Sequence, residues 1–158
     1  MECLTLTRRT LLAGLAGAAA AAAGLLPGRA EAGPVNATPA GVAIEGFDPV
    51  AYFKEGKPVK GSEAFTAAHD GVTWQFASAA NRDAFKEAPE KYAPQFGGYC
   101  AYAVSRGYTA KIDPQAWSIV AGKLYLNYSP GVRERWAQDK AGNIAKGEAN
   151  WPRLKKAL

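Results

Sequence analysis

Two stretches of the chain alternate apolar and polar residues around a two-residue turn, which is typical of a β-hairpin. The first places residues 65–69 and 72–76 on either side of Asp70-Gly71, a pair that readily takes the positive φ angles of a type I′ turn. Such a turn sets the register, and one face then carries three pairs: His69 with Val72, Ala67 with Trp74, and Phe65 with Phe76. Apolar side chains therefore gather on one face of the predicted hairpin.

The second predicted hairpin joins residues 117–120 to residues 123–128 through Ala121-Gly122. This turn signal is weaker, because alanine tolerates positive φ poorly. The segment Tyr99–Val104 has the composition of either a strand or a helix, and Val42–Ile44 is a candidate for a short strand.

Helix signals follow each hairpin. Ser78 is a suitable N-cap for a helix over 79–88, with Phe85 turned inward. Ser129 caps a second helix that begins with Pro130. We expect Gly142 or Asn143 to divide this helix from a last one that ends before Pro152.

The two hairpin-and-helix segments resemble each other at an offset of 51 residues. Ser78 matches Ser129 and Phe85 matches Trp136 (129 − 78 and 136 − 85 are both 51), whereas Phe65 aligns with Trp117 only at an offset of 52. We therefore expect the hairpins to differ by one residue. Duplication and convergence explain the match equally well, because any ββα segment needs a turn glycine, a cap and an aromatic anchor. The predicted fold class is α+β, with small antiparallel hairpins packed against short helices in two similar ββα halves.

The N-terminus has the features of an export signal. Arg8 and Arg9 precede an uncharged run over 10–28, and Ala30-Glu31-Ala32 suits a signal peptidase. This resembles a twin-arginine signal that is cut after Ala32, which predicts a periplasmic protein. A membrane anchor is the alternative for an uncharged run of this length, but the run is mostly weakly apolar Ala and Gly.

Composition suits one globular domain, with 48% hydrophobic and 21% charged residues. Removing 32 of 158 residues leaves 126, with 16 basic and 12 acidic side chains and a net charge of +4. The basic residues are dispersed, so nucleic-acid binding is not expected. Cys3 leaves with the signal, so Cys100 has no partner for an internal disulfide. We divide the chain into a signal peptide (1–32), a linker (33–45), a domain (46–151) and a basic tail (152–158).

Several motifs resemble the YHS domain family, and within it the small exported YHS-domain proteins. The resemblance extends from Gly46 to about Trp151, and the motifs are Gly46–Phe53, Trp74–Ser78, Asn81–Asp83, Phe85, Pro89–Tyr92, Gly97–Tyr102 and Asn150–Pro152. It implies an α+β fold and, for members attached to copper or heavy-metal transporters, soft-metal binding through cysteines. The matching positions here are Ala51, Ala77 and, approximately, Asn81, and none of them is a cysteine.

Cys100 and His69 are the only soft metal ligands left after residue 32. A closed zinc site needs four ligands, whereas Cu(I) tolerates fewer and favours thiolate. Copper bound by Cys100 with His69 is therefore our metal hypothesis. It requires the tip of the first hairpin to approach the loop after Gly97-Gly98.

Tyr99 and Tyr102 are the candidate ligand-binding residues, because tyrosines beside a Gly-Gly loop are suited to line a pocket for a small apolar or planar molecule. We expect a non-enzymatic binding module for a metal ion or small ligand, with no catalytic residue. The alternatives are a thiol-dependent or redox enzyme that uses Cys100, with His69 and Asp70 as formal triad partners, and a structural accessory protein. Unpaired cysteine is also often an inert core residue.

Overall fold

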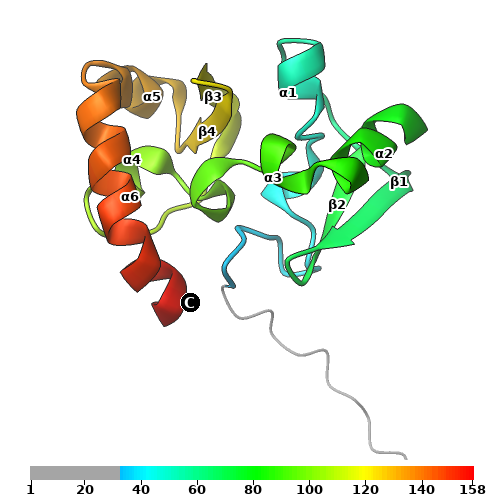
Figure 1. Ribbon diagram of the computed structural model, residues 1–158, viewed down its shortest axis with the longest axis horizontal. Helices are drawn as coiled ribbons and strands as arrows, with labels where there is room; N and C mark the ends of the chain where they lie inside the picture. Colours follow the sequence, from blue (N-terminus) through cyan, green and yellow to red (C-terminus); the bar gives the residue numbers. More distant parts are fainter. Residues whose placement is uncertain (1–32) are drawn as a thin grey trace, which may run out of the picture.

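The computed structural model describes residues 33–158, and the predicted signal peptide lies outside them. Figure 1 shows two lobes, each built on a two-stranded antiparallel hairpin with helices packed beside it. The first unit, residues 44–92, contains η1 (Ile44–Gly46), α1 (Ala51–Lys54), β1 (Ser62–His69), β2 (Val72–Phe76), α2 (Ala79–Glu87) and α3 (Pro89–Tyr92). The second unit, residues 95–137, contains η2 (Gln95–Gly98), α4 (Ala101–Ser105), β3 (Asp113–Val120), β4 (Lys123–Asn127) and α5 (Pro130–Ala137), and α6 (Lys140–Ala157) follows it. The predicted α+β class with two ββα halves is confirmed.

The first hairpin has the predicted turn. Asp70 and Gly71 have φ angles of 51° and 77°, as a type I′ turn requires, and His69 pairs with Val72. The predicted pairing of Phe65 with Phe76 is wrong, because a β-bulge between Ser62 and Thr66 shifts the register and Ser62 pairs with Phe76 instead.

The second hairpin repeats the first in register and in its bulge. Asp113 pairs with Asn127 and Trp117 with Leu126, each 51 residues after the matching pairs Ser62 with Phe76 and Thr66 with Gln75. The predicted one-residue difference between the hairpins is therefore wrong, since Trp117 corresponds to Thr66 and not to Phe65. Ala121 takes a φ of 50°, so its turn has the conformation of the first despite the weaker signal.

Both predicted serine caps are present. The Ser78 Oγ accepts a hydrogen bond from the Asn81 N–H at 3.1 Å, and the Ser129 Oγ accepts one from the Val132 N–H at 3.2 Å. Each capped helix then packs an aromatic ring on its hairpin in the same way, as two ring pairs show: Phe85 on Trp74 at 5.2 Å and 34°, and Trp136 on Tyr125 at 5.3 Å and 36°. The sequence repeat is thus a repeat of structure.

The repeat extends upstream of the hairpins. Ile44, Glu45 and Gly46 have φ angles of 40°, 58° and 77°, and Phe96, Gly97 and Gly98 have 57°, 58° and 77°. Each run leads into a short helix, α1 or α4, so Tyr99–Val104 is not a strand. Here the counterparts are 52 residues apart, which makes Cys100 the counterpart of Asp48 and Ala103 the counterpart of Ala51.

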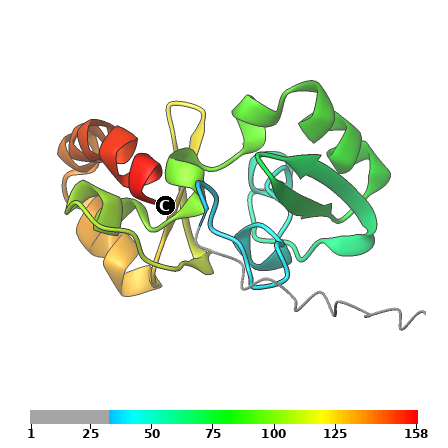
Figure 2. The same ribbon diagram turned by 90° about the horizontal axis from the view of Figure 1, so that it is seen from below.

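Residues 33–45, which composition predicts as a linker, pack between the two lobes (Figure 2). The Asn36 N–H donates to the Gly97 carbonyl at 2.8 Å, and the Asn36 side chain donates to the Gly98 carbonyl at 3.1 Å. Ala43 and Ile44 are completely buried. Instead of the expected strand, Val42 and Ala43 make isolated bridges to Thr73 and Ala37, and Ile44 begins η1.

The boundary between the two C-terminal helices lies earlier in the chain than predicted. Asp139 is the N-cap of α6, and its carboxylate accepts from the Gly142 N–H at 2.9 Å, so Gly142 and Asn143 lie inside the helix. The helix also continues through Pro152, which costs it one backbone hydrogen bond. Packing holds the predicted tail in this helix, because Leu154 is buried and the Asn150 side chain donates to the Val104 carbonyl at 3.0 Å.

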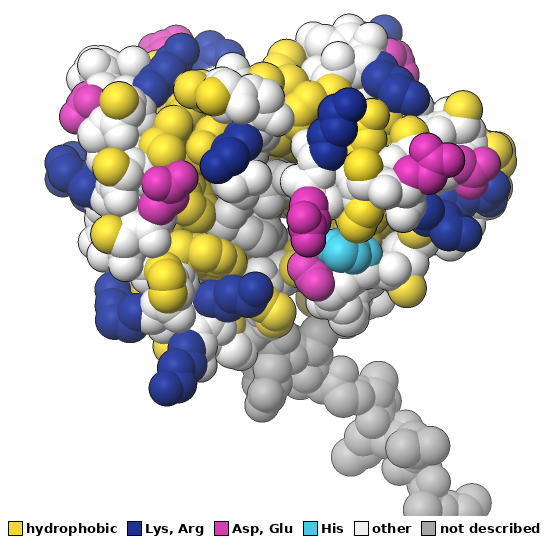
Figure 3. Space-filling model, viewed as in Figure 1, with side chains coloured by type: hydrophobic (Ala, Val, Ile, Leu, Met, Phe, Trp, Pro, Cys, Tyr) yellow, Lys and Arg dark blue, Asp and Glu magenta, His cyan; other side chains and the backbone are white. Residues whose placement is uncertain are grey.

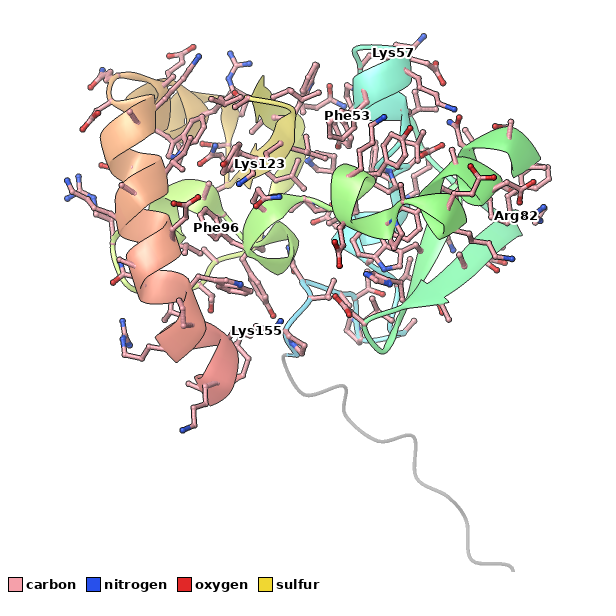
Figure 4. All side chains as sticks on the ribbon, in the orientation of Figure 1. Phe53, Lys57, Arg82, Phe96, Lys123 and Lys155 are labelled. Atoms are coloured by element: carbon pink, nitrogen blue, oxygen red, sulfur yellow. The ribbon has the colours of Figure 1, made fainter. Side chains whose placement is uncertain are left out.

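Two apolar clusters fill the interior. The larger one crosses both units, with Trp74 and Phe76 of the first and Leu124 and Leu126 of the second. The smaller one joins the second unit to α6, where Phe96 packs beside the helix (Figure 4) at 6.0 Å from the Trp151 ring. Among residues 33–158, no helix has the length and apolar character needed to span a bilayer.

Candidate functional site

A buried carboxylate organises the first unit. Asp48 is completely buried and accepts four hydrogen bonds: from the N–H of Val50 (2.8 Å), the N–H of Ala51 (3.2 Å), the N–H of Ala77 (2.9 Å) and the side-chain amide of Asn81 (2.7 Å). These bonds tie the start of α1 to the end of β2 and the first turn of α2. Both carboxylate oxygens are occupied within the fold.

The three positions at which the family resemblance places cysteines meet at this carboxylate. Ala51, Ala77 and Asn81 all donate to Asp48. Sequence reasoning identified these positions but not the residue at their centre. No group of three or more His, Cys, Asp or Glu side chains in the described part of the chain is arranged to hold a metal ion. The first unit therefore has an internal hydrogen-bond cluster in place of the thiol ligands.

The second unit has a different set of hydrogen bonds at the place equivalent to Asp48. Cys100, the counterpart of Asp48, is buried, and its thiol donates to the Asn127 side-chain oxygen at 3.7 Å. That oxygen also accepts from the Tyr102 N–H at 3.1 Å. The Asn127 side-chain nitrogen is buried and has no acceptor among residues 33–158.

An open pocket of about 330 Å³ lies over this cluster. It is lined by three tyrosines, one arginine, one cysteine and small apolar residues: Cys100, Tyr102, Ala103, Tyr108, Ala110, Tyr128, Val132 and Arg135. Ala103, Tyr128 and Val132 are the counterparts of Ala51, Ala77 and Asn81. We call this cavity the Cys100 pocket. It occupies, in the second unit, the place that the Asp48 cluster fills in the first.

The rim of the Cys100 pocket is basic. Arg135 lines it directly, and no carboxylate is among the lining residues. Arg106 holds Tyr102 from the side, since its guanidinium donates to the phenol oxygen at 2.8 Å and lies 5.0 Å from the ring centre. Lys111 lies 5.9 Å from the centre of the Tyr128 ring. These cations orient two of the pocket tyrosines and make the local potential positive.

Of the residues predicted as ligands, the Cys100 pocket contains Cys100 and Tyr102. Tyr99 points elsewhere, because its hydroxyl donates to the Gly33 carbonyl at 2.8 Å and its ring lines a separate pocket of about 440 Å³ beside residues 33–41 and the tip of the first hairpin. Burial raises the pKa of Tyr99 above its usual value. Tyr99 and Tyr102 therefore do not share a pocket.

His69 lines a third pocket, beside Phe85, Lys86 and Pro89. Its ring packs edge-on against Phe85 at 5.6 Å, and its Nε2 lies 3.5 Å from the Asp70 carboxylate. The turn of the first hairpin lines the pocket that contains Tyr99. His69 and Cys100 each line another pocket, so the structure does not bring these two residues together.

Sequence reasoning missed Tyr108, Tyr128, Val132 and Arg135 as pocket residues. The repeat held the signal for two of them, because carrying Ala77 and Asn81 forward by 51 residues leads to Tyr128 and Val132. Tyr108 and Arg135 have no such signal, since loop geometry and the phase of α5 bring them to the pocket.

Comparison with known protein families matches residues 50–96 to the YHS domain. No curated protein and no solved structure matches the chain. The match includes Ala51, Ala77 and Asn81, and it ends where the second unit begins, so the Cys100 pocket lies outside it. Residues 50–96, which form most of the first ββα unit, therefore match the YHS domain.

Proposed function

We propose that this protein is a non-enzymatic binding module whose second unit holds a small molecule in the Cys100 pocket. The observation that carries the proposal is the contrast between equivalent places in the two units, one filled by Asp48 and its four donors, the other an open pocket of about 330 Å³. Small-molecule sites are concave and mostly apolar, with a few placed polar groups, and the Cys100 pocket has this character.

The surroundings of Cys100 support binding over thiol catalysis. A cysteine nucleophile of the triad type needs an adjacent base to take up the thiol proton. No histidine, aspartate or glutamate lines the Cys100 pocket, and the partner of the thiol is the Asn127 side chain. An asparagine amide does not accept a proton at neutral pH, so it does not act as a general base.

A copper ion is the alternative ligand for the Cys100 pocket. A soft ion favours a thiolate, and Cys100 lines the pocket, but His69 lines a different one. The Cys100 pocket supplies one soft ligand and several aromatic rings, which favours an organic molecule over a metal ion. On the face shown in Figure 3, Lys and Arg side chains are spread over both lobes, which supports a small ligand over a nucleic acid.

The test is the native mass of the protein purified from its own cells, with and without a side chain that fills the pocket. Val132→Trp places an indole in the cavity, and Glu134→Trp places one at an exposed position of the same helix. We expect an organic molecule bound to the wild type and to Glu134→Trp but lost from Val132→Trp. Equal retention by both variants would contradict the proposal. A wild type that instead carries stoichiometric copper, lost in Cys100→Ser, would replace it with metal binding.

We also propose that the protein is exported and acts in the periplasm. The support is the sequence alone, with Arg8 and Arg9 ahead of an uncharged run and Ala30-Glu31-Ala32 behind it. Replacing both arginines with lysine should leave the protein in the cytoplasm, while the exported wild type should begin at Gly33. Full export of the double variant would contradict the twin-arginine assignment.

A further inference from the structure

We infer that the occupant of the Cys100 pocket is a small aromatic anion, held with its ring against the tyrosines and its negative group at Arg135. The inference rests on the proposed function and narrows it to one class of ligand. Three features of the pocket carry it: its walls, its charge and its relation to the first unit.

The walls favour a flat ring. Tyr102, Tyr108 and Tyr128 line the pocket, and Cys100, Ala103 and Ala110 add small side chains. Aromatic rings pack well against one another in offset or edge-to-face geometry, and the small residues leave room for a planar group. The volume of about 330 Å³ lies at the lower end of ligand pockets, which limits the occupant to a small ring system.

The charge favours an anion. Arg106 is bound to the Tyr102 hydroxyl and Lys111 lies at the Tyr128 ring, but within residues 33–158 no carboxylate lies within ion-pair distance of Arg135. A guanidinium at the edge of a pocket without acidic residues is suited to a carboxylate, which it binds with two parallel hydrogen bonds.

The first unit has a carboxylate at the place where the second unit has none. There, the chain itself supplies a carboxylate, Asp48, to the donors at this place. In the second unit the counterpart is Cys100, and the buried Asn127 nitrogen beside it has no acceptor among the described residues. The second unit therefore has no carboxylate of its own at this place, and Arg135 lines the Cys100 pocket without an acidic partner in the described part of the chain. A ligand anion at Arg135 would supply the negative charge that Asp48 supplies in the first unit.

The test uses four probes of similar size and isothermal titration calorimetry on the mature protein. The probes are 2-naphthoate, the neutral 2-naphthamide, the cation 2-naphthylmethylammonium and the non-aromatic decalin-2-carboxylate. We expect 2-naphthoate to bind about tenfold or more tightly than each of the others, because only it offers both a ring and an anion.

Arg135→Gln should reduce 2-naphthoate affinity about tenfold and leave 2-naphthamide unchanged. Lys86→Gln removes one positive charge from the surface of the first unit and is the control for net charge, with no effect expected. Equal affinity for naphthoate and naphthamide would contradict the preference for an anion. Equal affinity for naphthoate and the decalin acid would contradict the preference for an aromatic ring. Either result leaves the proposed function intact. Failure of all four probes to bind the wild type would overturn this inference, and the native-mass comparison with Val132→Trp judges the proposed function separately.

Discussion

Asp48 and Cys100 show how one residue separates two otherwise similar places in the molecule. Asp48 is short enough to remain at the start of α1 and still reach Ala77 and Asn81, so its carboxylate closes the first unit. The Cys100 thiol makes one weak hydrogen bond, to Asn127, and leaves the space above it open. The sequence predicted Cys100 as a metal ligand and Tyr102 as a ligand-binding residue, and both line the Cys100 pocket. It did not predict Asp48, because burial of an aspartate beside a proline is not visible in a pattern that also fits an exposed turn.

The Asp48 cluster predicts a large and specific loss of stability. Asp48→Ala leaves four N–H donors without an acceptor, and we expect the free energy of unfolding to fall by about 3 to 5 kcal/mol in urea titrations. Asp48→Asn keeps one acceptor oxygen and should cost about 2 kcal/mol. The control is Asp83→Asn, where an exposed carboxylate pairs with Arg82 and the expected change is below about 1 kcal/mol. A loss as small in Asp48→Ala as in the control would show that the cluster does not stabilise the fold.

Tyr52 predicts a pH dependence. Burial raises its pKa above the usual value near 10, with the charges of Asp113, Glu45 and Asp48 adding to the effect, and its hydroxyl donates to the Pro114 carbonyl at 2.9 Å. The folded state therefore keeps this proton to higher pH than the unfolded chain. The stability that Tyr52 contributes is complete below about pH 10 and declines as the pH rises toward the folded pKa.

Tyr52→Phe should lower stability at neutral pH by about 1 kcal/mol and make the alkaline decline shallower, as urea midpoints from about pH 8 to about pH 11 would show. Some decline should remain, because burial also raises the pKa of Tyr99 and Tyr125. Tyr108→Phe alters an exposed tyrosine and should keep the wild-type slope. An unchanged slope in Tyr52→Phe would contradict the assignment.

The elements were more predictable than the site, because turns and caps are local chemistry. Asp70-Gly71 and Ser78 identified a turn and a helix start from two or three residues each. The failures involve long-range packing. The bulge in each hairpin has no residue signature, and α6 passes Pro152 because burial of Leu154 and the Asn150 hydrogen bond outweigh one missing backbone bond.

The matched hairpins allow a paired test of turn conformation. Gly71 and Gly122 have φ angles of 77° and 72°, and a Cβ on either one would meet no atom within 4 Å. A valine Cβ therefore fits at both positions, and we expect the positive φ to cost about 1 to 3 kcal/mol at each of them in thermal or urea unfolding. Gly131→Val, where φ is not positive and space is also open, should cost less. Equal effects at all three positions would show that the left-handed conformation is not the cause.

At the scale of the whole molecule, the repeat does not make two independent domains. The larger apolar cluster includes β2 of the first unit and β4 of the second, and residues 33–45 bond to the Gly97-Gly98 loop. The sequence indicated two similar halves but not that they share a core, because contacts between repeats involve residues far apart in the chain. The Cys100 pocket is lined by the second unit alone, but two of its lining residues, Cys100 and Ala103, also belong to this shared cluster.

A shared core predicts that a destabilising substitution in one unit also lowers the stability of the other unit. Leu126 is completely buried in the larger cluster, so Leu126→Ala should cost about 2 to 5 kcal/mol. Because unfolding is cooperative, hydrogen exchange of the most protected amides in β1 and β2 should accelerate by the same factor as in β3 and β4. Ile119→Ala alters an exposed side chain of β3 and should change neither set much. If Leu126→Ala accelerated exchange only in β3 and β4, the two units would unfold separately, and the cluster between them would be a contact surface between domains and not a common core.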